Sequence, residues 1–180
     1  MRKNIIAKVT ATVMMVTCMA AMTACGNDQS TSSQAGVTAA DAAATQQSGG
    51  YTFEAKNVAM TIDGKVEDYK AKLGEPAGGY YEAKSCAFDG MDKFYYYDGF
   101  TLQAYQKNNE DVVYSLLLLD DTVKTKEGVK IGDNKDKMVS AYGSSYKEGS
   151  GQFTYTSGNT NLIFTVNNDV IEGIEYVLAN

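Results

Sequence analysis

The chain contains the same helix-like segment twice, and this repetition limits the folds that are open to it. Residues 62–74 align with residues 131–143 without a gap, at an offset of 69 residues. In both segments, apolar side chains recur at helical spacing. Both segments close with a glycine, Gly74 or Gly143, which readily takes the left-handed conformation that ends a helix. Repetition at a fixed offset indicates two copies of one structural unit, each beginning with a short helix of about three turns.

Runs of alternating apolar and polar residues follow each predicted helix, with turn residues between them, and such runs predict antiparallel hairpins. The predicted strands are residues 93–97, 100–105 and 112–119 in the first half, and 152–155, 162–166 and 170–177 in the second. An additional strand is expected between residues 51 and 62. We therefore predict an α+β fold of two tandem repeats, about 60–120 and 129–178. Each repeat supplies a helix and a three-stranded antiparallel meander to one sheet, with the helices on one face.

The N-terminus is typical of a secretory signal. Arg2, Lys3 and Lys8 form a positive head, residues 9–24 carry no charge, and small residues lead directly into Cys25. This pattern predicts a signal peptide over residues 1–24 whose cleavage leaves Cys25 as the new N-terminus. A retained transmembrane anchor is the alternative, although the uncharged run is short for a span, which needs about 20 apolar residues.

This N-terminus resembles a bacterial lipoprotein signal, with Met22 where leucine is commonest. The resemblance implies that Cys25 carries diacylglycerol and palmitate-type acyl chains, which would hold the protein at the extracellular face of the cell membrane. Residues 25–50 lack aromatic side chains and predict a flexible linker, with a helix over residues 39–45 as the alternative. All 13 tyrosines and all 6 phenylalanines lie in residues 51–180, which predicts a single folded domain there.

Composition excludes several kinds of chemistry. Loss of residues 1–24 would leave 13 lysines against 22 acidic residues, a net charge of −9, which disfavours nucleic-acid binding. The chain has no histidine, the commonest general base and nitrogen metal ligand. Cys86 is the only cysteine beyond Cys25, so we expect no internal disulfide and a buried, inert thiol. We predict no catalytic residue and no cofactor, because residue types suited to catalysis are scarce. We also predict no metal, because the carboxylates that cluster in the sequence lack calcium-loop spacing.

Tyrosines are the best lead to a site. An aromatic sheet face is a common recognition surface, since tyrosine combines a large contact area with a polar tip. The candidate binding residues are Tyr95, Tyr96, Tyr97, Phe100, Tyr105 and Tyr155. In a regular strand Tyr96 must face opposite to its two neighbours, so these residues are divided between the two faces of the sheet. A tyrosine-rich core is the alternative interpretation.

The tandem helix-and-meander plan resembles the fold of β-lactamase inhibitory protein, and a single copy resembles the small assembly lipoprotein of the outer-membrane barrel machinery. Residues 85–90, 93–97 and 131–133 resemble a group of uncharacterised lipoproteins from clostridia-type Gram-positive bacteria. That resemblance covers most of residues 60–178, and its motifs carry no known chemistry. The likeness to the inhibitor concerns architecture, and architecture does not imply function.

Two classes of function remain. The first is a noncatalytic surface module that binds a protein or a cell-envelope component through its sheet. It predicts an exposed aromatic cluster on one sheet face and no deep pocket. The second is an envelope hydrolase that uses carboxylate or lysine chemistry. It predicts a concave pocket where such groups converge with perturbed pKa values. We expect the first class, and a surface filler without a specific ligand is a third possibility.

Overall fold

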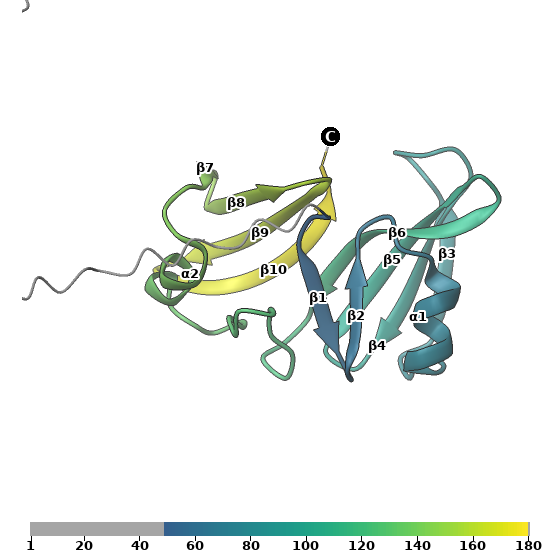
Figure 1. Ribbon diagram of the computed structural model, residues 1–180, viewed down its shortest axis with the longest axis horizontal. Helices are drawn as coiled ribbons and strands as arrows, with labels where there is room; N and C mark the ends of the chain where they lie inside the picture. Colours follow the sequence, from purple (N-terminus) through teal and green to yellow (C-terminus); the bar gives the residue numbers. More distant parts are fainter. Residues whose placement is uncertain (1–48, 180) are drawn as a thin grey trace, which may run out of the picture. The chain divides into compact units, whose positions relative to one another are not determined.

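The computed structural model describes residues 49–179 as an α+β fold, with one eight-stranded antiparallel sheet, a separate two-stranded hairpin and two short helices (Figure 1). The elements in chain order are β1 (Thr52–Ala55), β2 (Val58–Thr61), α1 (Val66–Leu73), β3 (Tyr80–Lys84), β4 (Met91–Tyr97), β5 (Phe100–Lys107), β6 (Glu110–Leu118), α2 (Lys135–Tyr142), β7 (Lys147–Gly149), β8 (Gln152–Ser157), β9 (Thr160–Asn167) and β10 (Val170–Leu178). The predicted signal, Cys25 and most of the predicted linker lie outside the described residues. Within those residues, no helix is long and apolar enough to cross a membrane.

The sheet runs in the order β3-β4-β5-β6-β10-β9-β8-β7, so each half of the chain supplies four neighbouring strands. The halves join where β6 pairs with β10, from Leu118 opposite Ile174 to Ser115 opposite Val177. The prediction of one antiparallel sheet is therefore confirmed. The three-stranded meander is wrong by one strand in each half, because β3 and β7 also join the sheet. Both are edge strands with few buried side chains, so they lack the apolar alternation that reveals a strand.

The region before the first helix also differs from the prediction. It holds a hairpin, β1 and β2, in place of one strand. Lys56 and Asn57 form its two-residue turn, both with positive φ, as a tight hairpin turn of this type requires. The hairpin packs on the sheet through Phe53, whose ring centroid lies 5.1 Å from that of Phe100 and 5.8 Å from that of Tyr176. Phe53 therefore contacts both repeats across the β6–β10 seam.

Both helices form where the repeat predicted them. Gly74 and Gly143 follow the two helices with φ of +79° and +81°, which confirms their role as helix terminators. Asn134 begins α2, because its side-chain oxygen accepts a hydrogen bond from the Lys137 N–H at 2.9 Å. Neither helix is long enough to be stable alone, so each depends on the side chains that it buries against the sheet.

One tyrosine in each repeat ties the helix end to the sheet. The Tyr97 hydroxyl donates to the Gly74 carbonyl at 3.2 Å, and the Tyr155 hydroxyl donates to the Gly143 carbonyl at 2.7 Å. Across the seam Leu116 is opposite Tyr176, and both are fully buried on the side that carries these tyrosines. The two helices therefore cover the same face of the sheet, as predicted. We call this the helix side, and the other the open face.

Replacing Tyr155 with phenylalanine should lower the free energy of unfolding by about 1 kcal/mol, since it leaves the Gly143 carbonyl without its buried donor. Urea denaturation followed by circular dichroism measures this change. Tyr81→Phe is the control, because the Tyr81 side chain is exposed and should change stability by less than about 0.5 kcal/mol. Equal stability of the two variants would contradict the role given to the Tyr155 hydroxyl.

The chain enters the fold at Gly50, which packs against the β8–β9 turn. Gly50 has a φ of +86°, and a Cβ at this position would lie 2.5 Å from the Thr160 hydroxyl oxygen. A larger residue therefore does not fit there. The other end of the described chain reaches the same turn, because the Ala179 N–H donates to the Asn159 carbonyl at 2.8 Å. Both ends of the fold thus meet at one turn of the second repeat.

Candidate binding site

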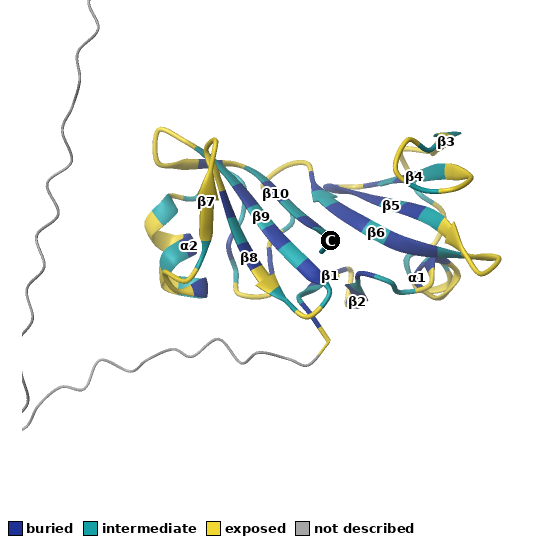
Figure 2. Ribbon diagram, turned by 90° about the horizontal axis from the view of Figure 1, so that it is seen from above, coloured by how far each residue is buried: buried dark blue, intermediate teal, exposed yellow. Residues whose placement is uncertain are grey.

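The structure buries four of the six predicted binding residues. Figure 2 shows buried and partly buried segments along the central strands, and Tyr95, Tyr97, Phe100 and Tyr155 are at most 6% exposed. All four lie on the helix side. The tyrosine-rich core was the alternative interpretation of these side chains, and it accounts for Tyr97, Phe100 and Tyr155. An exposed contact role for these three is therefore withdrawn. Tyr95 is also a core residue, but part of it lines a pocket.

Tyr96 and Tyr105 lie on the open face and are half-buried. The loop between β3 and β4 folds over this face, and its Phe88 ring stacks on Tyr105 with 4.0 Å between the ring centroids. Tyr114 completes this cluster, with its ring 5.2 Å from Phe88. Nearer the sheet edge, Tyr81 remains 57% exposed. The open face therefore carries an aromatic surface, although the loop covers part of it.

The prediction that Cys86 is buried is wrong. Its side chain is exposed in the β3–β4 loop. The Ser85 hydroxyl oxygen accepts hydrogen bonds from the N–H groups of Ala87 and Phe88, at 3.2 and 2.9 Å. This local turn directs Phe88, rather than Cys86, onto the sheet.

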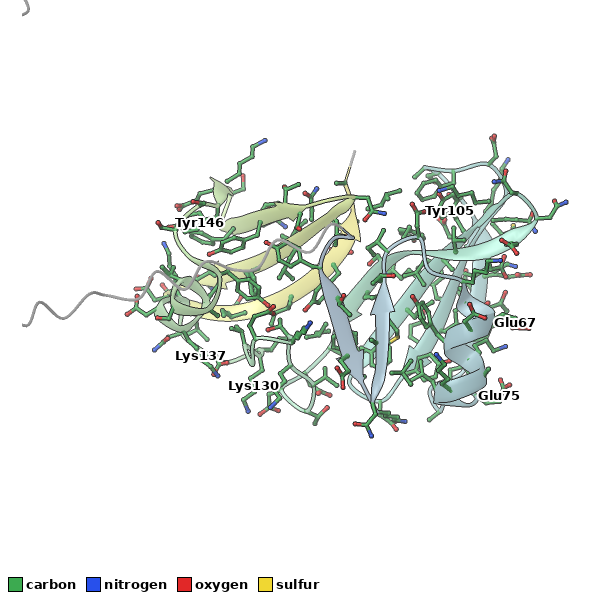
Figure 3. All side chains as sticks on the ribbon, viewed as in Figure 1. Glu67, Glu75, Tyr105, Lys130, Lys137 and Tyr146 are labelled. Atoms are coloured by element: carbon green, nitrogen blue, oxygen red, sulfur yellow. The ribbon has the colours of Figure 1, made fainter. Side chains whose placement is uncertain are left out.

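A concave feature lies on the helix side, beside α1. It is a pocket of about 650 Å³, within the range usual for small-molecule sites. The lining comes from α1 and the residues on either side of it, from strands β3 to β6, and from the β5–β6 turn. Its residues are Lys65, Val66, Glu67, Lys70, Glu75, Pro76, Tyr80, Lys93, Tyr95, Gln106, Asn109, Glu110 and Asp111. Figure 3 shows Glu67 and Glu75 near opposite ends of α1.

Two tyrosines give the pocket an aromatic wall. Tyr80 on edge strand β3 is opposite Tyr95 on β4, with 4.9 Å between ring centroids and 43° between ring planes. Tyr95 is buried, whereas Tyr80 is 48% exposed. The Tyr80 hydroxyl donates to Glu82 at 2.7 Å, and Lys70 Nζ lies 5.7 Å from the centre of the Tyr95 ring. The rings are therefore fixed by neighbours, and Tyr80 leaves much of its surface available for contact.

Ion pairs hold the polar wall. Lys93 Nζ lies 2.8 and 2.7 Å from the two carboxylate oxygens of Asp111, and their side chains are only 20% and 25% exposed. Lys65 Nζ lies 2.6 Å from Glu110 Oε1 at the more exposed rim. The Lys93–Asp111 pair is well shielded from water, which makes it the stronger constraint on shape.

The second repeat fills the corresponding place. Lys93 on β4 is opposite Glu82, and Phe153 on β8 is likewise opposite a glutamate, Glu148. Phe153 is 4% exposed, and Lys135 Nζ lies 4.1 Å from the centre of its ring. The first repeat thus has an ion-paired lysine where the second has a buried ring capped by a lysine. The pocket is therefore a property of the first repeat, and the shared fold does not require it.

Burial and nearby carboxylates raise the pKa values of both pocket phenols. Burial is the main cause for Tyr95, followed by the charges of Asp111 and Glu67, and its pKa rises to about 12. Burial, followed by the hydrogen bond to Glu82, raises the pKa of Tyr80 well above its ordinary value. Both phenols therefore keep their protons at neutral pH, and the Tyr80 hydroxyl donates its proton in the hydrogen bond to Glu82. Within residues 49–179, no cluster of three acidic, cysteine or histidine side chains could hold a metal ion.

The raised pKa of Tyr95 should make stability depend on alkaline pH. Its pKa is 10.0 when unperturbed and about 12 in the fold, so the unfolded chain ionises first. The contribution of Tyr95 to stability is therefore complete below pH 10 and is lost as the pH rises through 12. Urea midpoints measured across this range should fall less steeply for Tyr95→Phe than for wild type. If the urea midpoints of the two proteins fell equally steeply with pH, the raised pKa of Tyr95 would be contradicted.

Sequence reasoning missed the pocket, although it identified Tyr95. The lining residues come from four separate segments of the chain, and strand β3, which supplies Tyr80, was not predicted. One signal was present in the sequence. Lys93 stands next to the aromatic run 94–97 and occupies an inward position of β4, and strand pairing places Phe153 at the corresponding position of β8. A charged residue at a core position of a repeat is a sign of function or of a compensating partner.

Comparisons with known proteins give a distant likeness. No family model matches the chain, and no curated protein matches it. A solved structure with a similar arrangement is an extracellular protein containing an SCP domain from Bacillus anthracis strain Ames, with a TM-score of 0.48 and 15% identity. The match covers 64% of this chain and 43% of that protein, so the chain spans less than half of its length. Membership of the lipoprotein group suggested by the sequence stays a prediction.

Proposed function

We propose that this chain is a noncatalytic binding module, held at the extracellular face of the cell membrane by a lipid on Cys25, which engages a protein or cell-envelope component. The pocket beside α1 carries the proposal. Its exposed Tyr80 ring, fixed Tyr95 ring and ordered ion pair form a preorganised polar and aromatic surface. Such a surface suits ligand recognition, because little side-chain freedom is lost when a ligand binds.

A concave pocket is what the envelope-hydrolase hypothesis predicts, whereas the binding-module hypothesis predicts no deep pocket. The chemistry of the lining must therefore distinguish the two functions. A general acid or base works best when its pKa lies near the operating pH. Burial raises the pKa of the Tyr95 phenol to about 12, farther from neutral pH. The charge of Lys93 is already balanced by its ion pair with Asp111. These features favour binding. A hydrolase that uses the remaining carboxylates, Glu67 and Glu75, is the second candidate, since both line the pocket.

Adjacent tyrosines on β3 provide the test. Tyr80 borders the pocket and Tyr81 lies on the open face, and their exposures are similar at 48% and 57%. A soluble chain starting at Gly26 is immobilised and incubated with cell-envelope extract. We expect Tyr80→Ser to lose at least about tenfold in captured material and Tyr81→Ser to resemble wild type. Equal capture by wild type and Tyr80→Ser would refute the pocket as the binding site. Loss only in Tyr81→Ser would move the site to the open face.

A further inference from the structure

We infer that the pocket beside α1 takes an uncharged sugar ring, so that the ligand of this module is a neutral glycan. The inference rests on the proposed function and adds the chemical class of the ligand. It is carried by three features of the lining: the balance of its charges, the exposed aromatic ring, and the restriction of its free polar groups to side chains.

The charges of the lining nearly cancel. Three lysines and four carboxylates border the pocket. Lys93 is paired with Asp111 and Lys65 with Glu110, so Lys70 is the one lining lysine outside the ion pairs of the described residues. A polyanionic ligand needs several unpaired cations close together, and the pocket does not offer them. A ligand without net charge fits this balance.

The aromatic wall suits a flat ring edged with C–H groups. Tyr80 and Tyr95 meet at 43°, which forms an angled corner, and Tyr80 is 48% exposed. The negative face of an aromatic ring attracts the weakly positive C–H groups on the apolar face of a sugar. Around this corner, the Gln106 and Asn109 amides both donate and accept hydrogen bonds, whereas Glu67 only accepts them. Sugar hydroxyls, which donate and accept, can use all of these groups.

The backbone of β4 and β5 under the pocket already makes its hydrogen bonds to neighbouring strands. Strand β4 is paired with β3 on one side and β5 on the other, and β5 is paired with β4 and β6. An extended peptide gains much of its affinity from main-chain hydrogen bonds to a free strand edge. Strands β4 and β5 therefore offer no free edge, and a peptide lying across them would leave its own amides unpaired. Among the strands that line the pocket, only the edge strand β3, which carries Tyr80, has an unpaired side. A glycan has no such requirement.

The test uses defined sugars. Chitotetraose and cellotetraose are the neutral probes, and tetragalacturonate is the anionic control, each titrated calorimetrically into the chain starting at Gly26 at low and high salt. We expect a neutral tetrasaccharide to bind with an affinity that changes less than about twofold with salt. Tyr80→Ser should weaken binding at least about tenfold and Tyr81→Ser should not. Lys93→Phe gives this position the side chain that Phe153 supplies in the second repeat, and it should abolish binding of the neutral tetrasaccharide. Unchanged unfolding midpoints exclude misfolding as the cause.

Two results would overturn the inference. The first is failure of both neutral probes to bind. The second is tighter, salt-sensitive binding of tetragalacturonate. Proteinase K digestion of the envelope extract separates this failure from failure of the proposed function, because the protease destroys protein ligands and leaves glycosidic bonds intact. Capture that depends on Tyr80 but is abolished by the digestion would refute the glycan and retain a binding pocket. Capture that never depends on Tyr80 would refute both.

Discussion

Replacing Phe100 with alanine should cost about 3–5 kcal/mol in free energy of unfolding, the usual range for a fully buried phenylalanine. Phe100 has no exposed surface, and its ring centroid lies 5.1 Å from that of Phe53 and 5.2 Å from that of Tyr97. Its loss would leave a cavity where the hairpin meets the sheet. Urea denaturation followed by circular dichroism measures the change.

The same variant decides between two roles for Phe100, since the sequence nominated it as a contact residue. Tyr81→Ala is the control, because it removes an exposed aromatic ring and should cost less than about 0.5 kcal/mol. A Phe100→Ala protein with wild-type stability and impaired binding would restore the contact role and contradict the core described here.

Replacing Leu117 with proline should destroy the cooperative unfolding transition of the whole domain. Leu117 is opposite Thr101 on β5 and Glu175 on β10, so it lies in the interior of the sheet at the seam between the repeats. Proline lacks the N–H that an interior strand needs, and its ring disturbs the neighbouring strand. We expect a loss of about 3 kcal/mol or more, with both halves affected together.

Leu117→Thr is the matched control, because threonine keeps the N–H and suits a strand. Amide hydrogen exchange on the proline variant reports each half separately. Protection that persists in β8 and β9 while β4 and β5 become exposed would show that the repeats fold independently. It would also contradict the dependence on β6–β10 pairing inferred from the continuous sheet.

The sequence predicted those parts of the fold that have a local cause. Gly74 and Gly143 end their helices with φ of +79° and +81° and ψ of −170° and −175°, a combination that is open essentially only to glycine. Strands β4, β5, β8, β9 and β10 were recognisable because apolar and polar residues alternate along them. Edge strand β3 escaped notice because most of its side chains are exposed, so burial leaves no pattern in its sequence. The sequence predicts one strand where the hairpin of β1 and β2 forms, because the hairpin turn, Lys56–Asn57, contains no glycine.

The site was harder to predict, for a different physical reason. A run of consecutive tyrosines predicts a large aromatic surface, but it does not show on which face of the sheet each ring lies. The register places Tyr95 and Tyr97 on the helix side and Tyr96 on the open face. The pocket arises from contacts between residues far apart in sequence, such as Lys93 with Asp111 and Tyr80 with Tyr95. Such pairings follow from strand order, which depends on the whole sheet and not on any single segment.

The position of Gly50 has a mechanical consequence. A pull on the chain ahead of Gly50 would reach the β8–β9 turn and hairpin β1–β2 first, because Gly50 packs against that turn and Thr52 begins the hairpin. The force would act on the contacts of Phe53 with Phe100 and Tyr176, at the seam between the repeats, before it reached α1. A ligand at the proposed site beside α1 would therefore lie farther along the path of this force than the Phe53 contacts.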